Sequence, residues 1–463
     1  MSPEGTLEQL LAARASTVVA DDQRVANVGE VAARAASALR RRGVRRGDAV
    51  AFQLGNQIET VVLYRACWRL GAVAMALHHR MGTSERDELL DRLSPVLVMT
   101  EVDDVRELGE HDGRHETVDA DPDDDAVVLF TAGSTAQPKG VRHTHRGLAY
   151  KADLMVEVHE LSAPDVVLMP APLAHISGLL NGLLVPGVAG MTTVLMDRWS
   201  PADALELIER ERVSFMVGPP TFFVDLMDDP SFSPTKVESL RLVSSGGAGV
   251  TPDFVDRASA ALGARVKRSY GSTEAPTVAT SLSSDDLARA REFDGHAIGE
   301  ARLRIVDGEL QVRGPELFVG YLSTEQTKEA MADGWFRTGD LATLTDDGWL
   351  RIVGRKKDII IRAGENIAIR ELEDVLEANP AVSQAAVLGV DHRRLGEQVV
   401  AVVTTTGRRF TVDDCRRWFE AQGVARFKIP EVVLTLPELP LLPTGKLDRA
   451  RVRAMIETSD AIN

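Results

Sequence analysis

The stretch that decides the fold is TAGSTAQPKGVRHTH, residues 131–145, which follows the apolar run AVVLF at 126–130. The apolar run predicts a buried strand, so the next segment leaves the strand end as a loop rich in glycine and hydroxyl side chains. Backbone N–H groups in such a loop can converge on an anion, and Lys139 adds a positive charge. The GK[ST] ending of the Walker loop is missing. Composition alone therefore leaves a phosphate-binding loop and a plain surface turn as equal alternatives.

The length and composition of the chain are those of a globular, enzyme-sized protein with more than one domain. Its 463 residues exceed one ordinary core, and 44% of them are hydrophobic and 26% charged. The net charge of -16 argues against nonspecific nucleic-acid binding, which needs a basic surface. Residues 101–126 hold twelve acidic and two basic side chains, and we interpret this block as a solvent-exposed loop.

The cysteines and the longest apolar run bear on location. Cys67 and Cys415 offer neither a disulfide framework nor a metal-binding spacing, which favours a reducing, cytoplasmic compartment. The uncharged run 176–196 is long enough to span a bilayer, but it contains Asn181, Pro186 and four glycines. We therefore predict a buried helix, a turn and a strand there, and no transmembrane segment.

Helical and strand patterns alternate along most of the chain. Residues 29–42 and 58–70 have the apolar spacing of helices, and each is followed by a strand, GDAVAFQL and AVAMAL. Ser200 before Pro201 marks another helix start, which leads to the strand VSFMVG. This alternation predicts an α/β fold, with a large layered domain at residues 1–354.

The pattern changes near residue 354. A helix ending at Asn379-Pro380, the strands AAVLGV, VVAVVTT and EVVLTL, and a helix opening at Thr411 predict a small α+β domain at residues 355–463. Its 17 basic and 16 acidic residues leave it close to neutral beside a strongly acidic large domain.

The quoted loop resembles the TSGTTGxPKGV signature of the adenylate-forming superfamily, which includes acyl-CoA synthetases, luciferases and peptide-synthetase adenylation domains. A GV-x-x-GD segment precedes it at 43–48, and six further segments follow in the family's order. These are PLAHISG (172–178), SSGGAG (244–249), YGSTE (270–274), GWFRTGDL (334–341), GRKKDIIIRAGENI (354–367) and PTGKLDR (443–449). Ordered matches of this extent identify the chain as a member of the acyl-CoA synthetase branch.

The resemblance implies a reaction and its co-substrates. Family members join a carboxylic acid to AMP, and the CoA ligases among them then pass the acyl group to a thiol. The chain is therefore expected to use ATP, CoA and Mg²⁺, with a small carboxylic acid as substrate and its active site between two domains. Since two reactions share one site, the small domain is expected to be mobile, turning about Lys357.

The nucleotide-binding roles follow from the matching positions. The resemblance assigns the β- and γ-phosphates to four loop residues, which are Thr131, Ser134, Thr135 and Lys139. Tyr270 would pack against adenine, Thr273 would contact the α-phosphate, and Glu274 would hold Mg²⁺, which favours oxygen ligands. Asp340 would accept both ribose hydroxyls, and Arg355 would contact the ribose.

The remaining roles concern catalysis and the acyl group. Lys446 would bridge the acyl carboxylate and the α-phosphate as a movable point charge, acting with Thr273 and Glu274. Gly364 would leave room for the pantetheine arm of CoA. The resemblance places five residues at the acyl pocket, which are His175, Gly246, Gly247, Ala248 and Thr277. Small side chains without a cation favour an apolar monocarboxylic acid.

Several alternatives stay open at this point. His143 and His145 could suggest a metal pair, but no third ligand is evident. An acyl-AMP ligase that loads a carrier protein is the nearest competitor, and a carboxylate–amine ligase is another. The alanines at 132 and 136, where the family has serine and glycine, allow a non-catalytic adenylate-binding relative. The nucleotide end of CoA could contact any of eight cations, Arg393, Arg394, Arg408, Arg409, Arg416, Arg417, Arg426 and Lys428.

Overall fold

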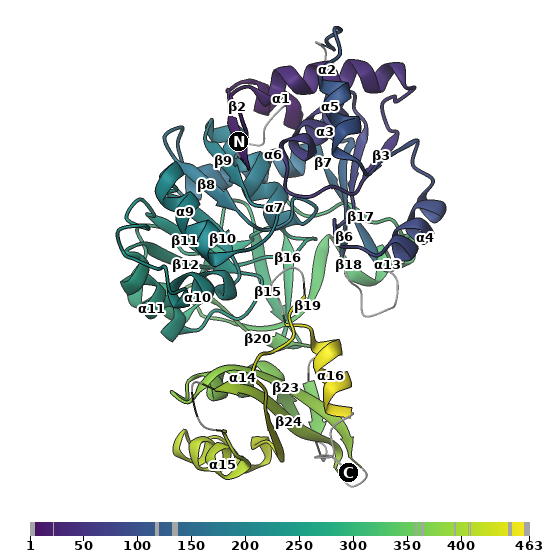
Figure 1. Cartoon of the computed structure of the whole chain (residues 1–463). Helices are drawn as coiled ribbons and strands as arrows, with labels where there is room; N and C mark the ends of the chain where they lie inside the picture. The colour runs from purple at the N-terminus through teal and green to yellow at the C-terminus, as the bar shows by residue number, and fades with distance from the viewer. Residues whose placement is uncertain are drawn as a thin grey trace. The chain divides into compact units, whose positions relative to one another are not determined.

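A computed structural model describes residues 5–21, 23–115, 120–131, 138–356, 359–362, 365–392, 395–405, 407, 409–442 and 447–457. The chain forms two compact units (Figure 1). The large unit comprises Met1–Val250, Phe254–Arg302 and Val312–Phe336, and the small unit Thr251–Asp253, Leu303–Gln311 and Arg337–Asn463. The predicted mixed α/β class, with a large N-terminal and a small C-terminal part, is confirmed, whereas the predicted boundary at 354/355 stays a prediction.

The first sheet of the large unit has a parallel centre and antiparallel edges. Its inner strands pair in parallel, and β2, β13 and β14 run antiparallel to their neighbours. In order of pairing they are β14 (His296–Ala297), β13 (Ala279–Thr280), β12 (Arg265–Tyr270), β11 (Leu242–Gly246), β10 (Phe215–Gly218), β8 (Val166–Met169), β9 (Thr192–Leu195), β1 (Thr17–Ala20) and β2 (Gln23–Val25). One face packs against α9 (Pro201–Glu211), α10 (Pro220–Asp228) and α11 (Pro252–Leu262). Ser200 caps α9 as predicted.

The second sheet of the large unit carries the quoted loop. Its strands are, in order, β17 (Gly320–Tyr321), β7 (Lys139–Thr144), β6 (Asp125–Thr131), β4 (Val73–Ala76), β3 (Ala49–Phe52) and β5 (Leu97–Met99). The strands β6, β4, β3 and β5 are parallel, while β7 and β17 are antiparallel to their neighbours. Leu89 of α4 (Thr83–Leu93) packs on the outer face.

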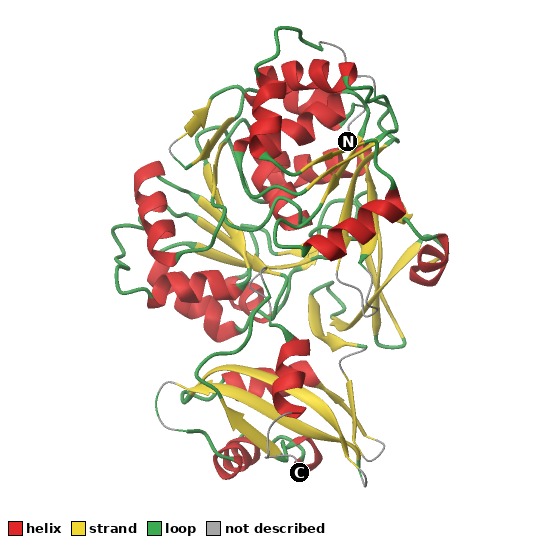
Figure 2. Cartoon of the chain, turned by 45° about the vertical axis from the view of Figure 1, so that its right-hand side comes forward, coloured by secondary structure: helices red, strands yellow, loops and turns green. Residues whose placement is uncertain are grey.

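A layer of helices fills the space between these two sheets. One core cluster joins residues of β6 and β8 with residues of α2 (Val28–Arg41), α3 (Ile58–Arg69) and α6 (His145–Val158). Figure 2 shows the helices of the large unit in red and its strands in yellow. The run 176–196 lies in the same core as α7 (Ile176–Leu179), a π-helical turn η1 (Leu180–Leu184), α8 (Val185–Ala189) and β9, which confirms the predicted helix, turn and strand.

The acidic block at 101–126 is not the loop that its charge predicts. It contains the helix α5 (Val102–Gly109), which buries Val105 and Leu108 in the same core as α2 and α3. Apolar residues at every third position give this segment one buried face, and the acidic residues occupy the other faces. A prediction based on net charge alone therefore missed an amphipathic helix.

Shorter elements complete the large unit. A capping box at Thr6 starts α1 (Leu7–Ala12). The others are α12 (Leu287–Glu292), α13 (Thr324–Ala330) and β18 (Met331–Ala332), which pairs with Trp335 and Phe336. Among the described residues, no helix is both long and apolar enough to cross a bilayer.

Two groups of strands lie wholly or largely in the small unit. The first comprises β15 (Arg302–Val306), β16 (Glu309–Arg313), β19 (Trp335–Leu344) and β20 (Leu350–Arg355). The second is the sheet β22 (Glu365–Ala368), β21 (Ile359–Arg362), β24 (Gly396–Thr405) and β23 (Val382–His392), with β25 (Val432–Thr435) beside β24. Its helical elements are α14 (Ile369–Glu377), α15 (Val412–Ala421), η2 (Arg426–Lys428) and α16 (Arg449–Glu457). The predicted helices and strands of this region are confirmed.

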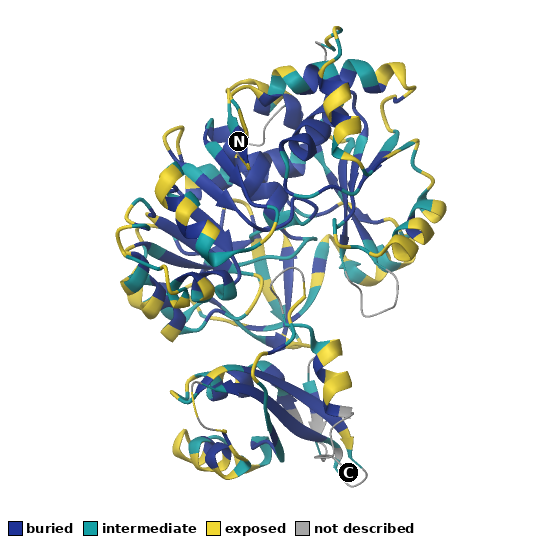
Figure 3. Ribbon diagram, viewed as in Figure 1, coloured by how far each residue is buried: buried dark blue, intermediate teal, exposed yellow. Residues whose placement is uncertain are grey.

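The long strands β23 and β24 are buried on both faces. Val387, Val399 and Ala401 pack with α14 and α15, while Leu388 and Val400 pack with α16 on the opposite face. Figure 3 shows the middle of both strands in dark blue. Burial on both faces explains why AAVLGV and VVAVVTT are continuous apolar runs rather than alternating ones.

Candidate active site

The phosphate-binding hypothesis depends on the connection between β6 and β7. These strands form an antiparallel pair in which Thr131 lies opposite Lys139, so the last residue of β6 and the first residue of β7 are brought together. The predicted strand at 126–130 is therefore confirmed and extends by one residue at each end. Ser134 and Thr135, together with the alanines at 132 and 136, lie outside the described residues.

The YGSTE segment forms a tight turn where β12 ends. Tyr270 is the last residue of β12, and its carbonyl accepts a hydrogen bond from the Val278 N–H at 2.9 Å. A Cβ on Gly271 would lie 2.3 Å from the backbone nitrogen of Thr277, so this position requires glycine. Thr277 itself has φ of 34°, in the left-handed region that threonine rarely adopts. Thr273 and Glu274 therefore lie in a turn whose backbone is closely packed at Gly271 and strained at Thr277.

Two side chains from the second sheet hold Thr273 and Glu274. His143 of β7 donates from Nε2 to the Thr273 carbonyl at 2.7 Å. Burial lowers the pKa of His143 to about 4, so the ring is neutral at pH 7. The hydroxyl of Tyr321 in β17 donates to Oε1 of Glu274 at 2.7 Å. Burial, and next the Glu274 carboxylate, raise the pKa of Tyr321 well above its ordinary value, so the hydroxyl stays a donor.

Lys139 belongs to the same cluster of side chains. Its Nζ lies 4.9 Å from the centroid of the Tyr321 ring, within the range of a cation–π interaction. The backbone N–H of Phe318 donates to the Glu274 carbonyl at 2.9 Å. Three predicted residues, Lys139, Thr273 and Glu274, are therefore linked through His143 and Tyr321. In the sequence alone, His143 stands out only as one of a possible metal pair, and no motif points to Tyr321.

The predicted ribose-binding residues lie together in the small unit. Asp340 of β19 is paired with Arg355 of β20, and the Arg355 Nε donates to Asp340 Oδ1 at 2.9 Å. The turn before Asp340 is fixed by Glu309, whose Oε1 accepts the Gly339 N–H at 3.0 Å. Gly339 has φ of 73°, which favours glycine. Glu309 is 5% exposed, and its Oε2 lies 3.5 Å from Lys356 Nζ.

The predicted acyl-pocket residues fall into two places within the large unit. Gly246 pairs with Ser269, and a Cβ on Gly246 would lie 2.3 Å from the Ser269 carbonyl oxygen. Gly246, Gly247, Ala248 and Thr277 therefore follow or flank the ends of neighbouring strands β11 and β12. His175 precedes α7, and its ring meets that of His78 at 5.1 Å.

Three further histidines, His78, His79 and His145, are buried or half-buried. The His78 ring stacks on His79 at 4.6 Å, and burial lowers the pKa of His78 to about 4. His145 is buried too, and burial lowers its pKa to about 4. Within the described part of the chain, no group of three or more histidine, cysteine, aspartate or glutamate residues could hold a metal ion.

Three further predicted residues, Lys357, Gly364 and Lys446, lie outside the described residues. The residues on either side of Gly364 and of Lys446 are paired with each other. Arg362 pairs with Glu365 on either side of Gly364 in the sequence, and Leu441 pairs with Leu447 on either side of Lys446. Arg449 then donates to both carboxylate oxygens of Glu373 at 2.7 and 2.8 Å.

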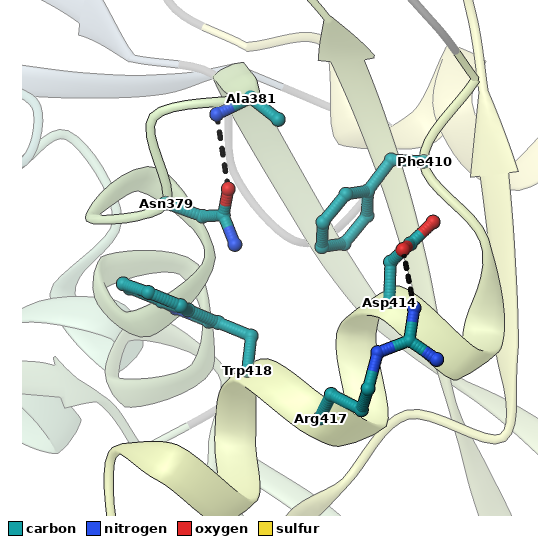
Figure 4. A pocket seen from close by; sticks show the side chains of 6 residues that line it. All are labelled: Asn379, Ala381, Phe410, Asp414, Arg417 and Trp418. Carbon is teal, nitrogen blue, oxygen red and sulfur yellow. Dashed lines mark hydrogen bonds and ion pairs between the residues drawn. The ribbon is translucent and has the colours of Figure 1, made fainter.

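A pocket of about 210 Å³ lies in the small unit, and its lining includes no residue of the predicted nucleotide site (Figure 4). It is lined by Asn379, Ala381, Phe410, Asp414, Arg417 and Trp418. Several of its polar groups serve local structure: Arg417 donates to Asp414 at 2.7 Å, and Asp414 belongs to the capping box of α15. The Trp418 indole donates to the Val375 carbonyl. The pocket marks the packing of α14 against α15.

The two cysteines are buried and free. Burial raises the pKa of both Cys67 and Cys415 to about 12, so neither forms a thiolate at neutral pH.

Comparisons with known proteins assign the family. Residues 18–322 match the family described as AMP-binding enzyme, and residues 371–446 match the AMP-binding enzyme C-terminal domain. The chain is 32% identical to the indoleacetate–CoA ligase of Aromatoleum aromaticum over 94% of this chain and 93% of the relative. It is 29% identical to the medium-chain fatty-acid–CoA ligase of Escherichia coli, with 89% and 82% covered. The chain belongs to the AMP-binding enzymes of the adenylate-forming superfamily.

A solved structure supports the same assignment. The structure of ATP-bound MatB from Rhodopseudomonas palustris superposes with a TM-score of 0.89 at 26% sequence identity. The match covers 98% of this chain and 99% of that chain. The likeness therefore extends over both units.

Proposed function

We propose that this protein is an AMP-forming acyl-CoA ligase that activates an apolar monocarboxylic acid with ATP. The observation that carries the proposal is the cluster in which Tyr321 links Lys139 to Glu274 while His143 holds Thr273. These groups supply a cation, a carboxylate and a hydroxyl at one place, which is the set that a nucleotide triphosphate with its metal needs. The relatives that are named as CoA ligases support CoA as the acceptor of the acyl group.

The proposed reaction has two steps in which atoms balance. In the first, an oxygen of the substrate carboxylate attacks the α-phosphorus of ATP, and the bond to pyrophosphate breaks to leave acyl-AMP. In the second, the sulfur of CoA attacks the acyl carbon, the bond to AMP breaks, and the thiol proton passes to water. The protein contributes placement and electrostatic stabilisation of the phosphate oxygens.

The roles that we propose follow from the chemistry of each group. Lys139 and Thr131 would hold the β- and γ-phosphates with Ser134 and Thr135, and Thr273 would contact the α-phosphate. Lys446 would place its charge between the acyl carboxylate and the α-phosphate. In the small unit, Asp340 would accept the ribose hydroxyls with Arg355 beside it.

Tyr270 would pack against adenine, Lys357 would serve as the hinge of a mobile small domain, and Gly364 would admit the pantetheine arm. The mobility follows from the two-step reaction, since different groups must reach the acyl carbon in each step.

The chemistry of Glu274 and its neighbours fits magnesium. Mg²⁺ usually binds through one or two carboxylates together with substrate phosphates, rather than in a cage of protein ligands. Glu274 offers one carboxylate in contact with Tyr321, close to the ring that faces Lys139. When bound, Mg²⁺ would supply positive charge against the phosphate oxygens.

The substrate class follows from the acyl-pocket residues and the relatives. Gly246, Gly247 and Ala248 leave space and carry no charge, and His175 would form a neighbouring wall. The two relatives are named for a medium-chain fatty acid and for indoleacetate, both monocarboxylic acids with an apolar body.

The test is pyrophosphate release across a panel of fatty, aromatic and polycyclic acids, with and without CoA. We expect release with apolar monocarboxylic acids, and formation of AMP and thioester when CoA is added. A carrier-protein ligase would release pyrophosphate without forming a thioester on free CoA, and the relatives give that alternative no support. No release with any acid would contradict the proposal.

A further inference from the structure

Tyr321 lies between two residues to which the proposed function gives different tasks. Its hydroxyl donates to Oε1 of Glu274 at 2.7 Å, and its ring centroid lies 4.9 Å from Nζ of Lys139. Glu274 is the proposed ligand of Mg²⁺, and Lys139 is a proposed contact of the β- and γ-phosphates. One side chain of 6% exposure therefore contacts both.

The tyrosine is fixed from several sides. β17 pairs with β7, with Tyr321 opposite Val141, and the Tyr321 backbone N–H donates to Thr327 Oγ1 at 2.8 Å. The ring of Phe318 meets the Tyr321 ring edge-on at 4.9 Å. Phe318 also donates its N–H to the Glu274 carbonyl at 2.9 Å. The tyrosine and the glutamate are thus held against each other by backbone and side chain together.

A fixed donor and a fixed ring have different effects on their two neighbours. A carboxylate that accepts a hydrogen bond from a rigid hydroxyl is held in one rotamer. It can then bind a cation without first changing its conformation. An ammonium is attracted to the face of an aromatic ring, so the long lysine side chain stays close to the strand end. Both effects prepare the site before nucleotide arrives.

We propose that Tyr321 is a positioning residue for the adenylation step, which orients the Glu274 carboxylate toward Mg²⁺ and holds Lys139 ready for the phosphates. The proposal rests on the proposed function. The new element is that Tyr321 couples the binding of the metal ion to the binding of the phosphates. A tyrosine that served only to fill the core would leave the Mg²⁺ dependence of ATP binding unchanged.

The first experiment removes only the hydroxyl with Tyr321→Phe. ATP binding is measured by calorimetry at a series of Mg²⁺ concentrations, and adenylation is measured by ATP–pyrophosphate exchange. We expect the Mg²⁺ concentration for half-maximal binding to rise at least about tenfold and the exchange rate to fall at least about tenfold, as expected for loss of one hydrogen bond to a charged group. The KM for the acid should stay the same.

Tyr150→Phe is a matched control, because Tyr150 is also 6% exposed. Its hydroxyl accepts the Glu300 N–H at 2.7 Å and contacts neither Lys139 nor Glu274. Tyr150→Phe should leave both the Mg²⁺ dependence and the exchange rate as in the wild type. Equal effects of the two variants would overturn the proposal.

Two further variants separate the hydroxyl from the ring. Tyr321→Leu also removes the ring, and we expect it to weaken ATP binding further than Tyr321→Phe even at saturating Mg²⁺. In a Glu274→Gln background, Tyr321→Phe should no longer change the Mg²⁺ dependence, because the two groups act together. Independent effects of these two substitutions would contradict the coupling.

Failure of the proposed function has a different signature. A wild-type protein that binds ATP with Mg²⁺ but exchanges no pyrophosphate with any acid would refute the ligase assignment, and the calorimetric comparison would still decide the role of Tyr321. A wild-type Mg²⁺ response in Tyr321→Phe, in an active enzyme, would refute the role of Tyr321 alone.

Discussion

Lys151 and Glu316 form an ion pair from which water is excluded: Nζ lies 3.2 Å from Oε1, and both side chains are 0% exposed. Nζ also donates to the Thr277 carbonyl at 3.0 Å, so the pair is tied to the residue with φ of 34° beside the YGSTE turn. Burial lowers the pKa of Lys151, and the Glu316 carboxylate opposes this shift. The pair thus fixes a strained segment next to the proposed nucleotide site.

Breaking this pair should destabilise the large unit. Lys151→Met leaves the Glu316 carboxylate buried without its partner, and we expect the free energy of unfolding to fall by about 3–5 kcal/mol. Urea unfolding followed by fluorescence measures the change. The double variant Lys151→Met with Glu316→Leu should recover most of the loss, because neither position then carries a charge.

A surface pair provides the control. Arg212 and Glu238 lie 2.9 Å apart with side chains 68% and 61% exposed, so Arg212→Met should cost less than about 1 kcal/mol. A loss for Lys151→Met as small as that for Arg212→Met would show that burial of the first pair has no energetic consequence.

Gly271 should be intolerant of a side chain. Gly271→Ala places a Cβ 2.3 Å from the Thr277 nitrogen, so the turn that carries Thr273 and Glu274 must shift. We expect ATP–pyrophosphate exchange to fall at least about tenfold, since small displacements of reacting groups are costly. Gly82→Ala is the control, because a Cβ there would meet nothing within 4 Å and φ is -62°. Wild-type exchange in Gly271→Ala would show that the turn has room to adapt.

The positions of the strands at whose ends the site residues lie could be predicted from the sequence. The contacts between those residues could not. Apolar runs and their order located β6 and β12, and the motifs located Lys139 and Glu274. The hydrogen bond from Tyr321 to Glu274 joins residues 47 positions apart, and that from His143 to Thr273 joins residues 130 positions apart. Neither has a local pattern, because each depends on how the two sheets are packed.

The prediction that the acidic block at 101–126 is a loop was wrong because it relied on charge and ignored the spacing of the apolar residues. In the acidic block, charge suggested a loop, whereas the spacing of Val102, Val105 and Leu108 determined a helix with one buried face. Lys151 and Glu316 show the converse. Two charged residues would normally be placed at the surface, but each is buried because the other neutralises it.

His143 should make stability depend on pH. Its pKa is about 4 in the folded protein and near 6.5 in an unfolded chain. Between these values the unfolded state binds a proton that the folded state excludes, so this contribution is fully present above pH 6.5 and is lost as pH falls toward 4. At pH 5 the loss from His143 is about 2 kcal/mol.

The measurement compares unfolding at pH 7.5 and pH 5 for the wild type and His143→Gln. The glutamine amide can still donate to the Thr273 carbonyl but does not titrate. The variant should therefore lose about 2 kcal/mol less than the wild type between the two pH values. Equal losses would mean that His143 does not stay neutral in the folded protein.

Glu309 should matter for ATP through the turn that it holds. Glu309→Ala removes the acceptor of the Gly339 N–H, which fixes the segment before Asp340. A hydrogen bond of about 1 kcal/mol corresponds to about a fivefold rise in KM for ATP. Glu309→Gln retains a carbonyl acceptor and should recover most of this loss. An unchanged KM for ATP in Glu309→Ala would show that this hydrogen bond to the turn does not contribute to nucleotide binding.

Lys446 should be needed in the first step and dispensable in the second. Its flanks are fixed by the Leu441–Leu447 pairing and by the contact of Arg449 with Glu373. A cation delivered from this segment would favour the approach of the acid to the α-phosphate, but would have no such task once acyl-AMP exists. We expect Lys446→Ala to lower ATP–pyrophosphate exchange at least about a hundredfold, as for loss of a group that stabilises the transition state. Thioester formation from supplied acyl-AMP and CoA should stay largely intact.

Arg453→Ala removes another exposed cation from the same end of the chain and should change neither half-reaction. Because both assays use one protein preparation, misfolding of Lys446→Ala would lower both rates, whereas the proposed role lowers only the first. Unchanged exchange in Lys446→Ala would refute its assignment. Loss of both half-reactions in a folded variant would instead mean that this lysine also serves the thioester step, so that one cation is used in both positions of the small domain.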